Sequence, residues 1–111
     1  MDDCIFCKIG AGQIPSKKVF ENDRIYAFED INPQAPTHIL IIPKKHLVDM
    51  HDGAAEPGLL GEILARSAEI ACERGIRDYR LVSNSGAQAG QAVFHLHFHV
   101  LGGRRMRWPP G

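Results

Sequence analysis

The stretch Phe94-His95-Leu96-His97-Phe98-His99-Val100 alternates apolar residues with histidines. Successive side chains of a β-strand point to opposite faces of its sheet. The alternation therefore predicts a strand at 94–101, with the apolar residues packed beneath a helix and all three histidines on the other face. Alternate residues lie ~6.6 Å apart on such a strand, a spacing that suits an extended polar ligand.

Other segments complete one layered domain. Branched and aromatic residues predict strands at 18–21, 25–28, 38–42 and 79–83. A helix is predicted at 59–74, where apolar residues cover about half of the circumference and Gly75 follows as a left-handed cap. Hairpins with one main helix predict an α+β fold with a mostly antiparallel five-stranded sheet, because parallel strands would need a helix at each crossover.

The overall composition restricts the class of protein. A length of 111 residues is that of a single domain, expected to occupy residues 1–111. The 13 basic and 13 acidic side chains balance, which argues against nucleic acid and membranes as partners. No apolar run approaches the ~20 residues of a membrane span, and the acidic start lacks the features of a signal peptide. With the pair Cys4-x-x-Cys7, these features favour a cytoplasmic protein.

A glycine-containing loop at 84–92 precedes the histidine stretch. Gly86 and Gly90 allow positive φ angles, so the backbone N–H groups of the loop could form a nest for phosphate oxygens. Asn84 and Gln91 add neutral donors. A phosphate cradle beside histidines favours covalent catalysis, in which one imidazole attacks an electrophile and a neighbour transfers a proton.

Two other interpretations of the three histidines stay open. A His-x-His pair on a strand can bind one zinc ion with an open position for water, which would make the activity sensitive to chelators. The histidines could also be a solvent-exposed face, although Thr, Lys and Glu are more usual there.

The segment 95–100 resembles the signature of histidine triad proteins, His-φ-His-φ-His-φ, where φ is apolar. Longer segments resemble the Hint branch of that family: 28–38, 42–46, 90–94, 101–104 and 108–111. The resemblance implies a homodimer whose sheet extends across both subunits. It also implies hydrolysis of purine nucleoside 5′-phosphoramidates, such as adenosine monophosphate joined to lysine.

The resemblance further implies roles for individual histidines. His97 would attack the α-phosphorus and form a nucleotidyl-histidine intermediate, which water then hydrolyses. His99 would lie by the phosphoryl oxygens or the leaving group, and His38 would support this network from the neighbouring strand. The candidate catalytic residues are thus His38, His95, His97 and His99.

The same resemblance implies a nucleotide site. Asn84, Gly90 and Gln91 would hold the phosphate, and Asp30 would accept from the ribose hydroxyls. Some relatives carry a hydroxyl residue at the position of Ala92, so here the backbone and His99 would hold the phosphate without it. The tail at 102–111, with Trp108, would lie near the active site of the partner subunit and select the leaving group. The walls around the base would be Ile5, Phe6, Ile9, Phe28, Ile31 and Leu40.

A structural zinc ion is the cofactor that the resemblance implies. Cys4 and Cys7 alone supply half of a tetrahedral zinc site. Relatives that contain metal add two histidines, here His46 and His95. A zinc ion on these four residues would take His95 away from the chemistry. The alternative is a pair of reduced cysteines without metal.

Three other functions remain as alternatives. The same nucleophile could serve a dinucleoside polyphosphate hydrolase, and a nucleotide-binding regulatory protein could have incidental catalysis. A zinc hydrolase would use the histidines as ligands. The basic run Arg104, Arg105 and Arg107 is interpreted as a solvated tail, since nucleic-acid binding needs a wider patch.

Overall fold

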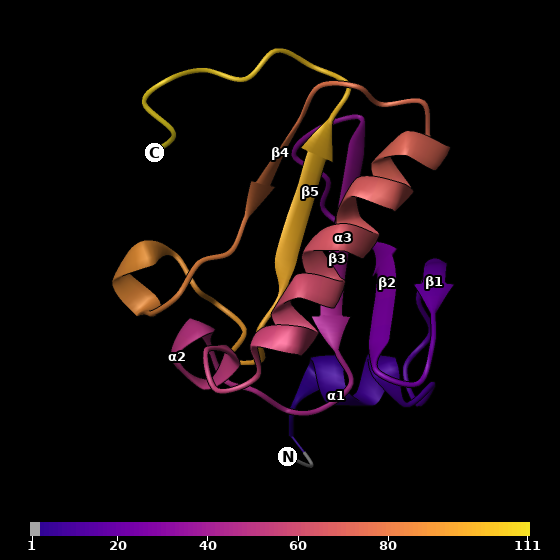
Figure 1. Cartoon of the computed structure of the whole chain (residues 1–111), viewed down its shortest axis with the longest axis vertical. Helices are drawn as coiled ribbons and strands as arrows, with labels where there is room; N and C mark the ends of the chain where they lie inside the picture. The colour runs from indigo at the N-terminus through magenta and orange to yellow at the C-terminus, as the bar shows by residue number, and fades with distance from the viewer. Residues whose placement is uncertain (1–2) are drawn as a thin grey trace.

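The structure, a computed structural model, describes residues 3–111 (Figure 1). Within them the sheet has the strand order β1-β2-β3-β5-β4, and every neighbouring pair is antiparallel. The predicted α+β fold, with a five-stranded sheet and one main helix, is therefore confirmed. In chain order the elements are α1 (Ile5–Gly10), β1 (Lys18–Glu21), β2 (Ile25–Glu29), β3 (Thr37–Pro43), α2 (Met50–Gly53), α3 (Pro57–Glu73), β4 (Tyr79–Val82), the 3-10 turn η1 (Ala87–Ala89) and β5 (Phe98–Gly102).

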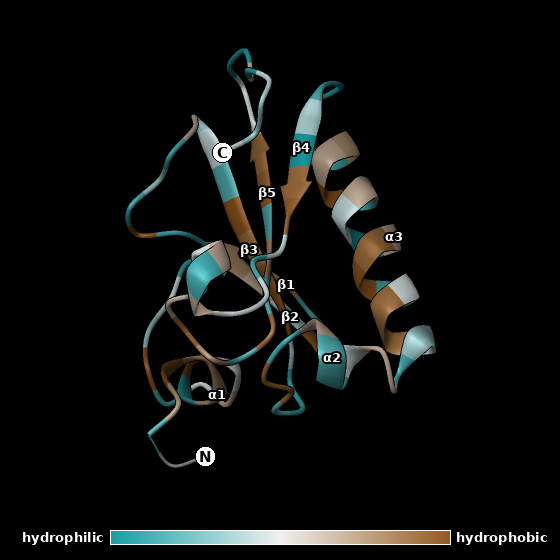
Figure 2. Cartoon of the chain, turned by 90° about the vertical axis from the view of Figure 1, so that its left-hand side faces the viewer, coloured by the Kyte–Doolittle hydropathy of each residue, from teal (hydrophilic) through white to brown (hydrophobic). Residues whose placement is uncertain are grey.

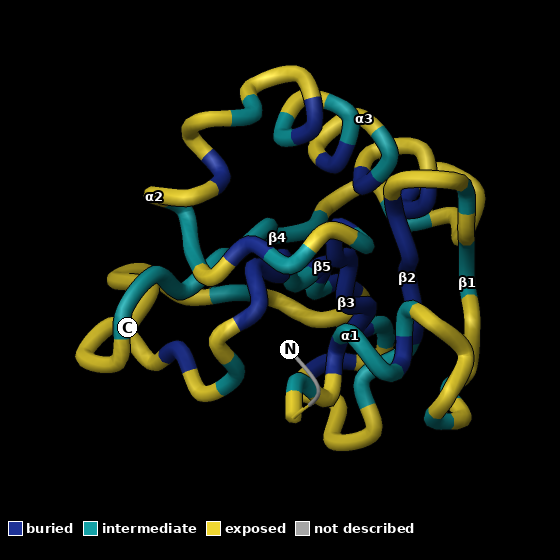
Figure 3. The backbone as a smooth tube through the Cα atoms, turned by 90° about the horizontal axis from the view of Figure 1, so that it is seen from below, coloured by how far each residue is buried: buried dark blue, intermediate teal, exposed yellow. Residues whose placement is uncertain are grey.

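The sheet separates two apolar clusters. Along β2, Ile25 and Ala27 belong to the larger cluster under α3, whereas Tyr26 and Phe28 belong to a smaller cluster with α1. Figure 2 shows α3 lying along one face of the sheet, and Figure 3 shows the central strands as deeply buried backbone. The face away from α3 is thus left for α1 and, as described below, for the histidines.

Helix α3 covers nearly the same residues as the apolar pattern that predicted it. Pro57 occupies its first turn, where the missing N–H has no helical partner to lose. Ile63 and Ile70 are buried against the sheet, and Gly75 has a φ of 72° just beyond the last turn. The predicted bounds of 59–74 differ from the observed ones by one or two residues. None of the described helices is both long and apolar enough to cross a lipid bilayer.

The histidine stretch forms a shorter strand than predicted. β5 begins at Phe98, and the residues shortly before it bend away. In the register between β3 and β5, Leu96 would face Pro43, which has no backbone N–H and ends β3. Leu96 instead donates its N–H to the Leu47 carbonyl oxygen over 2.6 Å. The predicted start of the strand was wrong, and Phe94 is 49% exposed rather than packed beneath α3.

Two short helices were not predicted, because six and four residues are too few to show a helical period. In α1, Phe6 and Ile9 are buried against the sheet face away from α3. This contact brings the N-terminal segment across the end of the sheet where the histidine stretch begins.

Candidate active site and metal centre

A cavity of about 320 Å³ opens on the α1 side of the sheet. Sites for small molecules typically have volumes of ~300–1,000 Å³. Except for Val93, every lining residue was assigned to nucleotide binding in the sequence analysis. Val93 was missed. The feature of the sequence that could have indicated it is its position as the apolar neighbour of Ala92. The lining residues are Ile5, Phe6, Ile9, Phe28, Asp30, Ile31, Leu40, Asn84, Gly90, Ala92, Val93, His97 and His99.

The tautomer of His97 follows from one contact. Its Nδ1 lies 2.8 Å from the carbonyl oxygen of His95. A carbonyl oxygen can only accept, so Nδ1 must carry the proton and donate it. The other ring nitrogen, Nε2, therefore has a free lone pair. The ring of Phe6 meets the His97 ring edge-on, with centroids 5.0 Å apart, and helps to fix its orientation.

A second chain of hydrogen bonds sets the tautomers of His38 and His99. The backbone N–H of Gln34 donates to Nδ1 of His38 over 3.0 Å, so the proton of His38 is on Nε2. This Nε2 lies 2.8 Å from Nδ1 of His99 and donates to it. The proton of His99 is then on its Nε2, which makes that nitrogen a donor. The site thus offers a free lone pair on His97 and an N–H on His99.

Burial dominates the electrostatics of these rings. It lowers the pKa of His38, His95 and His97 below the ordinary value of 6.5. For His99, burial and then the charges of His97 and His38 lower the pKa to about 4. The carboxylate of Asp30 opposes the shifts of His38, His97 and His99. All four histidines are therefore neutral at pH 7, the form in which an imidazole can attack an electrophile.

Acid should destabilise the protein through His99. Between pH 6.5 and about 4, the unfolded chain binds a proton that the folded ring excludes, so the free energy of unfolding falls as the pH falls. The ring is partly solvated, which reduces the full value of ~1.4 kcal/mol per pKa unit, and we expect a loss of about 1–2 kcal/mol. Urea denaturation at pH 7 and pH 4.5 measures this loss. His99→Asn should show a smaller loss, and an equal loss in both proteins would contradict the assignment.

The loop before the histidines has the backbone that its glycines predict. Gly86 and Gly90 have φ angles of 98° and 99°, on either side of the turn η1. The side chain of Asn84 lies next to Gly90, and a Cβ atom there would come within 3.6 Å of its Nδ2. The hydroxyl of Ser83 donates to the His97 carbonyl oxygen over 2.8 Å and ties the start of the loop to the histidine stretch.

Two residues that were assigned to nucleotide binding lie outside the cavity. Gln91 is 4% exposed, and its Oε1 accepts from the Gly86 N–H over 2.8 Å. Its Nε2 donates to the carbonyl oxygens of Val48 and Val93 over 2.7 and 3.1 Å. The side chain of Gln91 thus holds the loop in shape from within. Trp108 is 80% exposed on the C-terminal tail.

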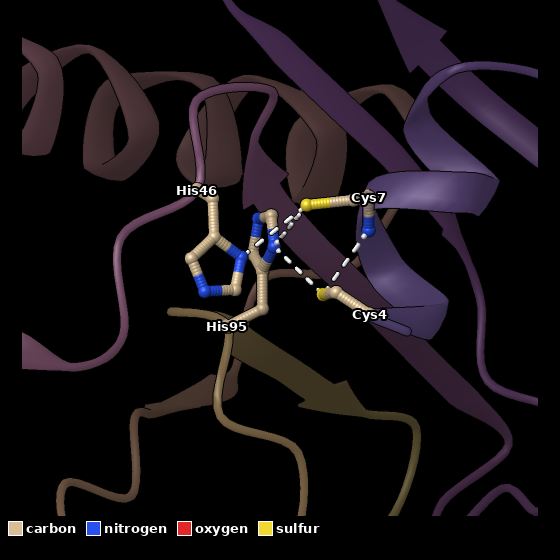
Figure 4. Close-up of side chains that lie close together, drawn as sticks. All are labelled: Cys4, Cys7, His46 and His95. Atoms are coloured by element: carbon tan, nitrogen blue, oxygen red, sulfur yellow. Dashed lines mark hydrogen bonds between the residues drawn. The ribbon is translucent and has the colours of Figure 1, made fainter. Parts of the chain in front are cut away.

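A group of sulfur and nitrogen atoms lies beside the cavity (Figure 4). Cys4 and Cys7 come from the start of α1, His46 from the segment after β3, and His95 from the bend before β5. Their four ligand atoms all lie within 4.8 Å of one another. This group can hold a metal ion. It also explains why His95 is turned away from His97 and His99.

The geometry of this group suits a tetrahedral ion. Cys4 Sγ and Cys7 Sγ lie 3.3 and 3.5 Å from Nδ1 of His95, and Cys7 Sγ lies 3.3 Å from Nδ1 of His46. Zinc bonds of ~2.3 Å to sulfur and ~2.0 Å to nitrogen at tetrahedral angles would place these atoms ~3.5 Å apart. Nε2 of His95 donates to the Pro43 carbonyl oxygen over 2.8 Å, so its Nδ1 is free to bind metal.

Without a bound cation, the thiol of Cys7 is protonated at pH 7. Burial, and then the hydrogen bond and charge of Cys4, raise the pKa of Cys7 to about 11. A divalent cation would offset the repulsion between two thiolate sulfurs and allow both of them to ionise. Asp30, His38 and His99 also bring ligand atoms together, but the hydrogen bond between the two histidines accounts for their closeness.

Comparison with known proteins agrees with this fold. The model of the HIT domain matches residues 11–106. A HIT family hydrolase from Legionella pneumophila is 51% identical, with a TM-score of 0.94 over 98% of this chain and 100% of that one. A HIT-like protein of Synechocystis sp. is 51% identical over 99% of this chain and 98% of its own length. A 14 kDa zinc-binding protein of Zea mays is 48% identical over 96% of this chain and 87% of its own. The matches span almost the whole chain and include the histidine stretch, so the protein belongs to the HIT domain family.

Proposed function

We propose that this protein hydrolyses purine nucleoside 5′-phosphoramidates through a covalent intermediate on His97. The observation that carries the proposal is the pair of tautomers in one cavity. Nε2 of His97 has a free lone pair because Nδ1 donates to the His95 carbonyl oxygen. Nε2 of His99 carries a proton because Nδ1 accepts from His38. One nitrogen can attack phosphorus while the other protonates the leaving group.

The reaction would proceed in two balanced steps. In the first, the hydrogen-bonded pair of His38 and His99 takes up one proton with the anionic substrate. Nε2 of His97 then forms a bond to the α-phosphorus, the phosphorus–nitrogen bond breaks, and the leaving nitrogen takes the proton from Nε2 of His99, which returns the pair to its neutral form. In the second, water attacks the phosphorus and returns a proton to His99, which releases the nucleoside monophosphate and free His97. Nδ1 of His97 keeps its proton throughout, and the His95 carbonyl oxygen stabilises the positive charge on the ring.

The remaining walls of the cavity suit a nucleoside. Phe6, Ile9, Phe28 and Leu40 supply a buried apolar surface for a base. Asp30 would accept from the ribose hydroxyls. The backbone of the loop at Gly90 and the amide of Asn84 would bind the phosphate. Ala92 contributes no hydroxyl at this position.

Asp30 offers a test of ribose binding. Asp30→Asn keeps the shape of the side chain but removes one acceptor, and a hydrogen bond to a charged group contributes ~1.5–3 kcal/mol. We expect KM for adenosine 5′-phosphoramidate to rise about tenfold or more, with a smaller effect on kcat. The matched control is the 2′,3′-dideoxy substrate, for which the variant should resemble the unmodified protein. Equal losses with both substrates would show that Asp30 acts on the histidines instead.

We further propose that the metal is zinc and that its role is structural. The four residues form a closed Cys₂His₂ set, and a zinc ion there would fix the N-terminal segment without taking part in the reaction. The zinc-binding relative from Zea mays supports the identity of the metal.

We also propose that the protein is a cytoplasmic homodimer of the Hint branch. Within residues 3–111, β4 is an edge strand of the sheet, so a second sheet can pair with it, and the tail at 102–111 would reach the partner's active site.

Substrate profiling tests the proposed activity directly. Release of adenosine monophosphate is measured with adenosine 5′-phosphoramidate and with diadenosine tetraphosphate, each with and without a chelator. Faster turnover of the phosphoramidate, unaffected by brief chelation, is expected. Preference for the tetraphosphate would favour the dinucleoside polyphosphate hydrolase, immediate loss with chelator would favour a zinc hydrolase, and no turnover of either would favour a regulatory nucleotide-binding protein.

A further inference from the structure

The two cysteines of the metal group are partly open to solvent, whereas His95 is fully buried. Cys7 lines a cavity of about 510 Å³, together with residues of α1 and with Lys18 and Glu21 of β1. Strand β1 lies at the opposite edge of the sheet from β4, the strand that we propose for pairing with a second subunit. Pairing at β4 therefore leaves this opening free, and a small molecule can approach Cys7.

The two cysteines are also spaced to form a bond with each other. Cys4 caps the N-terminus of α1, and Cys7 follows in its first turn. Positions three apart on a helix have Cα atoms ~5 Å apart, which falls within the range of ~4.4–6.8 Å found in disulfides. Cys7 donates its N–H to Sγ of Cys4 over 3.3 Å, so the Cys4 side chain already points toward Cys7 (Figure 4). A disulfide between them requires little movement of the backbone.

We propose that Cys4 and Cys7 form an oxidation site, at which a peroxide converts the two metal-binding thiolates into one disulfide. The sulfur of Cys7 first attacks a peroxide oxygen, the oxygen–oxygen bond breaks, and Cys7 becomes a sulfenic acid. The sulfur of Cys4 then attacks the sulfur of Cys7, the sulfur–oxygen bond breaks, and the disulfide forms. Overall, two thiolates, one hydrogen peroxide molecule and two protons give one disulfide and two water molecules. The two electrons that the sulfurs lose reduce the peroxide.

The disulfide would act on the proposed metal site and, through it, on His97. A thiolate is the form of cysteine that binds a metal ion, so the oxidised group would retain only His46 and His95 as ligands. The sulfurs would also leave Nδ1 of His95, which they now approach to 3.3 and 3.5 Å. The carbonyl oxygen of His95 accepts from Nδ1 of His97 over 2.8 Å, and Phe6 of α1 packs on the His97 ring. Oxidation would therefore release the metal and free the His97 ring, and the resulting loss of activity rests on the proposed function.

The test uses the full-length protein, loaded with zinc and treated with hydrogen peroxide. A colorimetric chelator measures the released zinc. Trypsin cleaves after Lys8, so both cysteines lie on one peptide, which the disulfide makes lighter by two hydrogen masses. We expect zinc release to follow the same time course as this change in mass, and dithiothreitol with added zinc to reverse both. The matched control is Cys72→Ser, which lacks the exposed cysteine outside the group and should respond to peroxide as the unmodified protein does.

Activity is measured separately, so that the oxidation site and the proposed function can fail independently. Peroxide should reduce the turnover of adenosine 5′-phosphoramidate about tenfold or more, because the attacking nitrogen is no longer held in position, and reduction with zinc should restore it. Zinc release with the disulfide, in a protein that shows no turnover at any stage, would support the oxidation site and refute the proposed function. Full turnover in the oxidised protein would refute the coupling to His97. The oxidation site itself is refuted by a protein that binds no zinc, by zinc that stays bound after peroxide treatment, or by oxidation confined to Cys72.

Discussion

Replacing His97 with alanine is expected to reduce the turnover of adenosine 5′-phosphoramidate by roughly 10,000-fold or more, because the variant lacks the attacking nitrogen. No other histidine can take its place. His95 uses Nε2 on the Pro43 carbonyl oxygen and turns Nδ1 toward the cysteine sulfurs. His99 has its lone pair directed at His38, which leaves only an N–H for the substrate. Steady-state release of adenosine monophosphate measures the loss.

His51→Ala is the matched control, since this histidine is exposed on α2 and does not line the cavity. It should keep full activity. A second measurement uses the unmodified protein and does not depend on how a variant folds. The reaction is stopped rapidly without acid, the protein is digested, and the peptides are analysed by mass spectrometry. We expect a nucleotidyl group on the peptide that contains His97. Turnover that survives in His97→Ala, or a nucleotidyl group on another residue, would reject the proposed nucleophile.

Replacing the proposed metal ligands Cys4 and Cys7 is expected to have the largest effect on stability. Cys4→Ser/Cys7→Ser should lower the midpoint of thermal unfolding by about 10 °C or more. The binding free energy of a structural zinc ion adds many kcal/mol to the free energy of unfolding. A change of ~1 kcal/mol in that free energy already shifts the midpoint of a domain of this size by several degrees. Loss of the metal should also reduce activity, through its effect on the position of His97. Without the metal, α1 would no longer hold Phe6 against the His97 ring, and His95 would no longer hold the carbonyl oxygen that fixes the His97 tautomer.

Calorimetry with and without prolonged chelation, together with a metal assay, measures this effect. Cys72→Ser is the matched control because Cys72 is exposed on α3, outside the group. It should retain one zinc ion per chain and the unfolding temperature of the unmodified protein. A protein without metal, or an unfolding temperature that chelation does not change, would leave the reduced cysteine pair as the correct interpretation.

The order of these effects separates a structural metal from a catalytic one. A structural ion lowers activity only as the fold loosens, so activity and the unfolding temperature should fall together in the cysteine variants. A zinc hydrolase would lose activity upon chelation while Cys4→Ser/Cys7→Ser remained fully active, because its ion would lie on the histidines of the cavity.

Patterns of short range predicted the five strands and the main helix, but not the two short helices α1 and α2. The 3.6-residue period of 59–74 is sufficient to predict α3, because a helix with one apolar side has few other places to bury it. The alternation Phe98-His99-Val100 likewise fixes which side chains of β5 face α3. These signals involve neighbours in sequence, and the structure confirms them to within a few residues.

Contacts between segments far apart in the chain determined which side chains meet in the site. The alternation alone placed His95 with His97 and His99, but β3 ends at Pro43, so the ladder stops and His95 turns toward Cys4 and Cys7. The pattern within one strand carries no information about the residue at which a neighbouring strand ends.

The sequence by itself thus determined that histidines line one face of an antiparallel sheet, and its resemblance supplied their expected roles. Only the tertiary structure decided which nitrogen of each ring carries a proton, because that depends on single atoms, the His95 carbonyl oxygen and the Gln34 N–H.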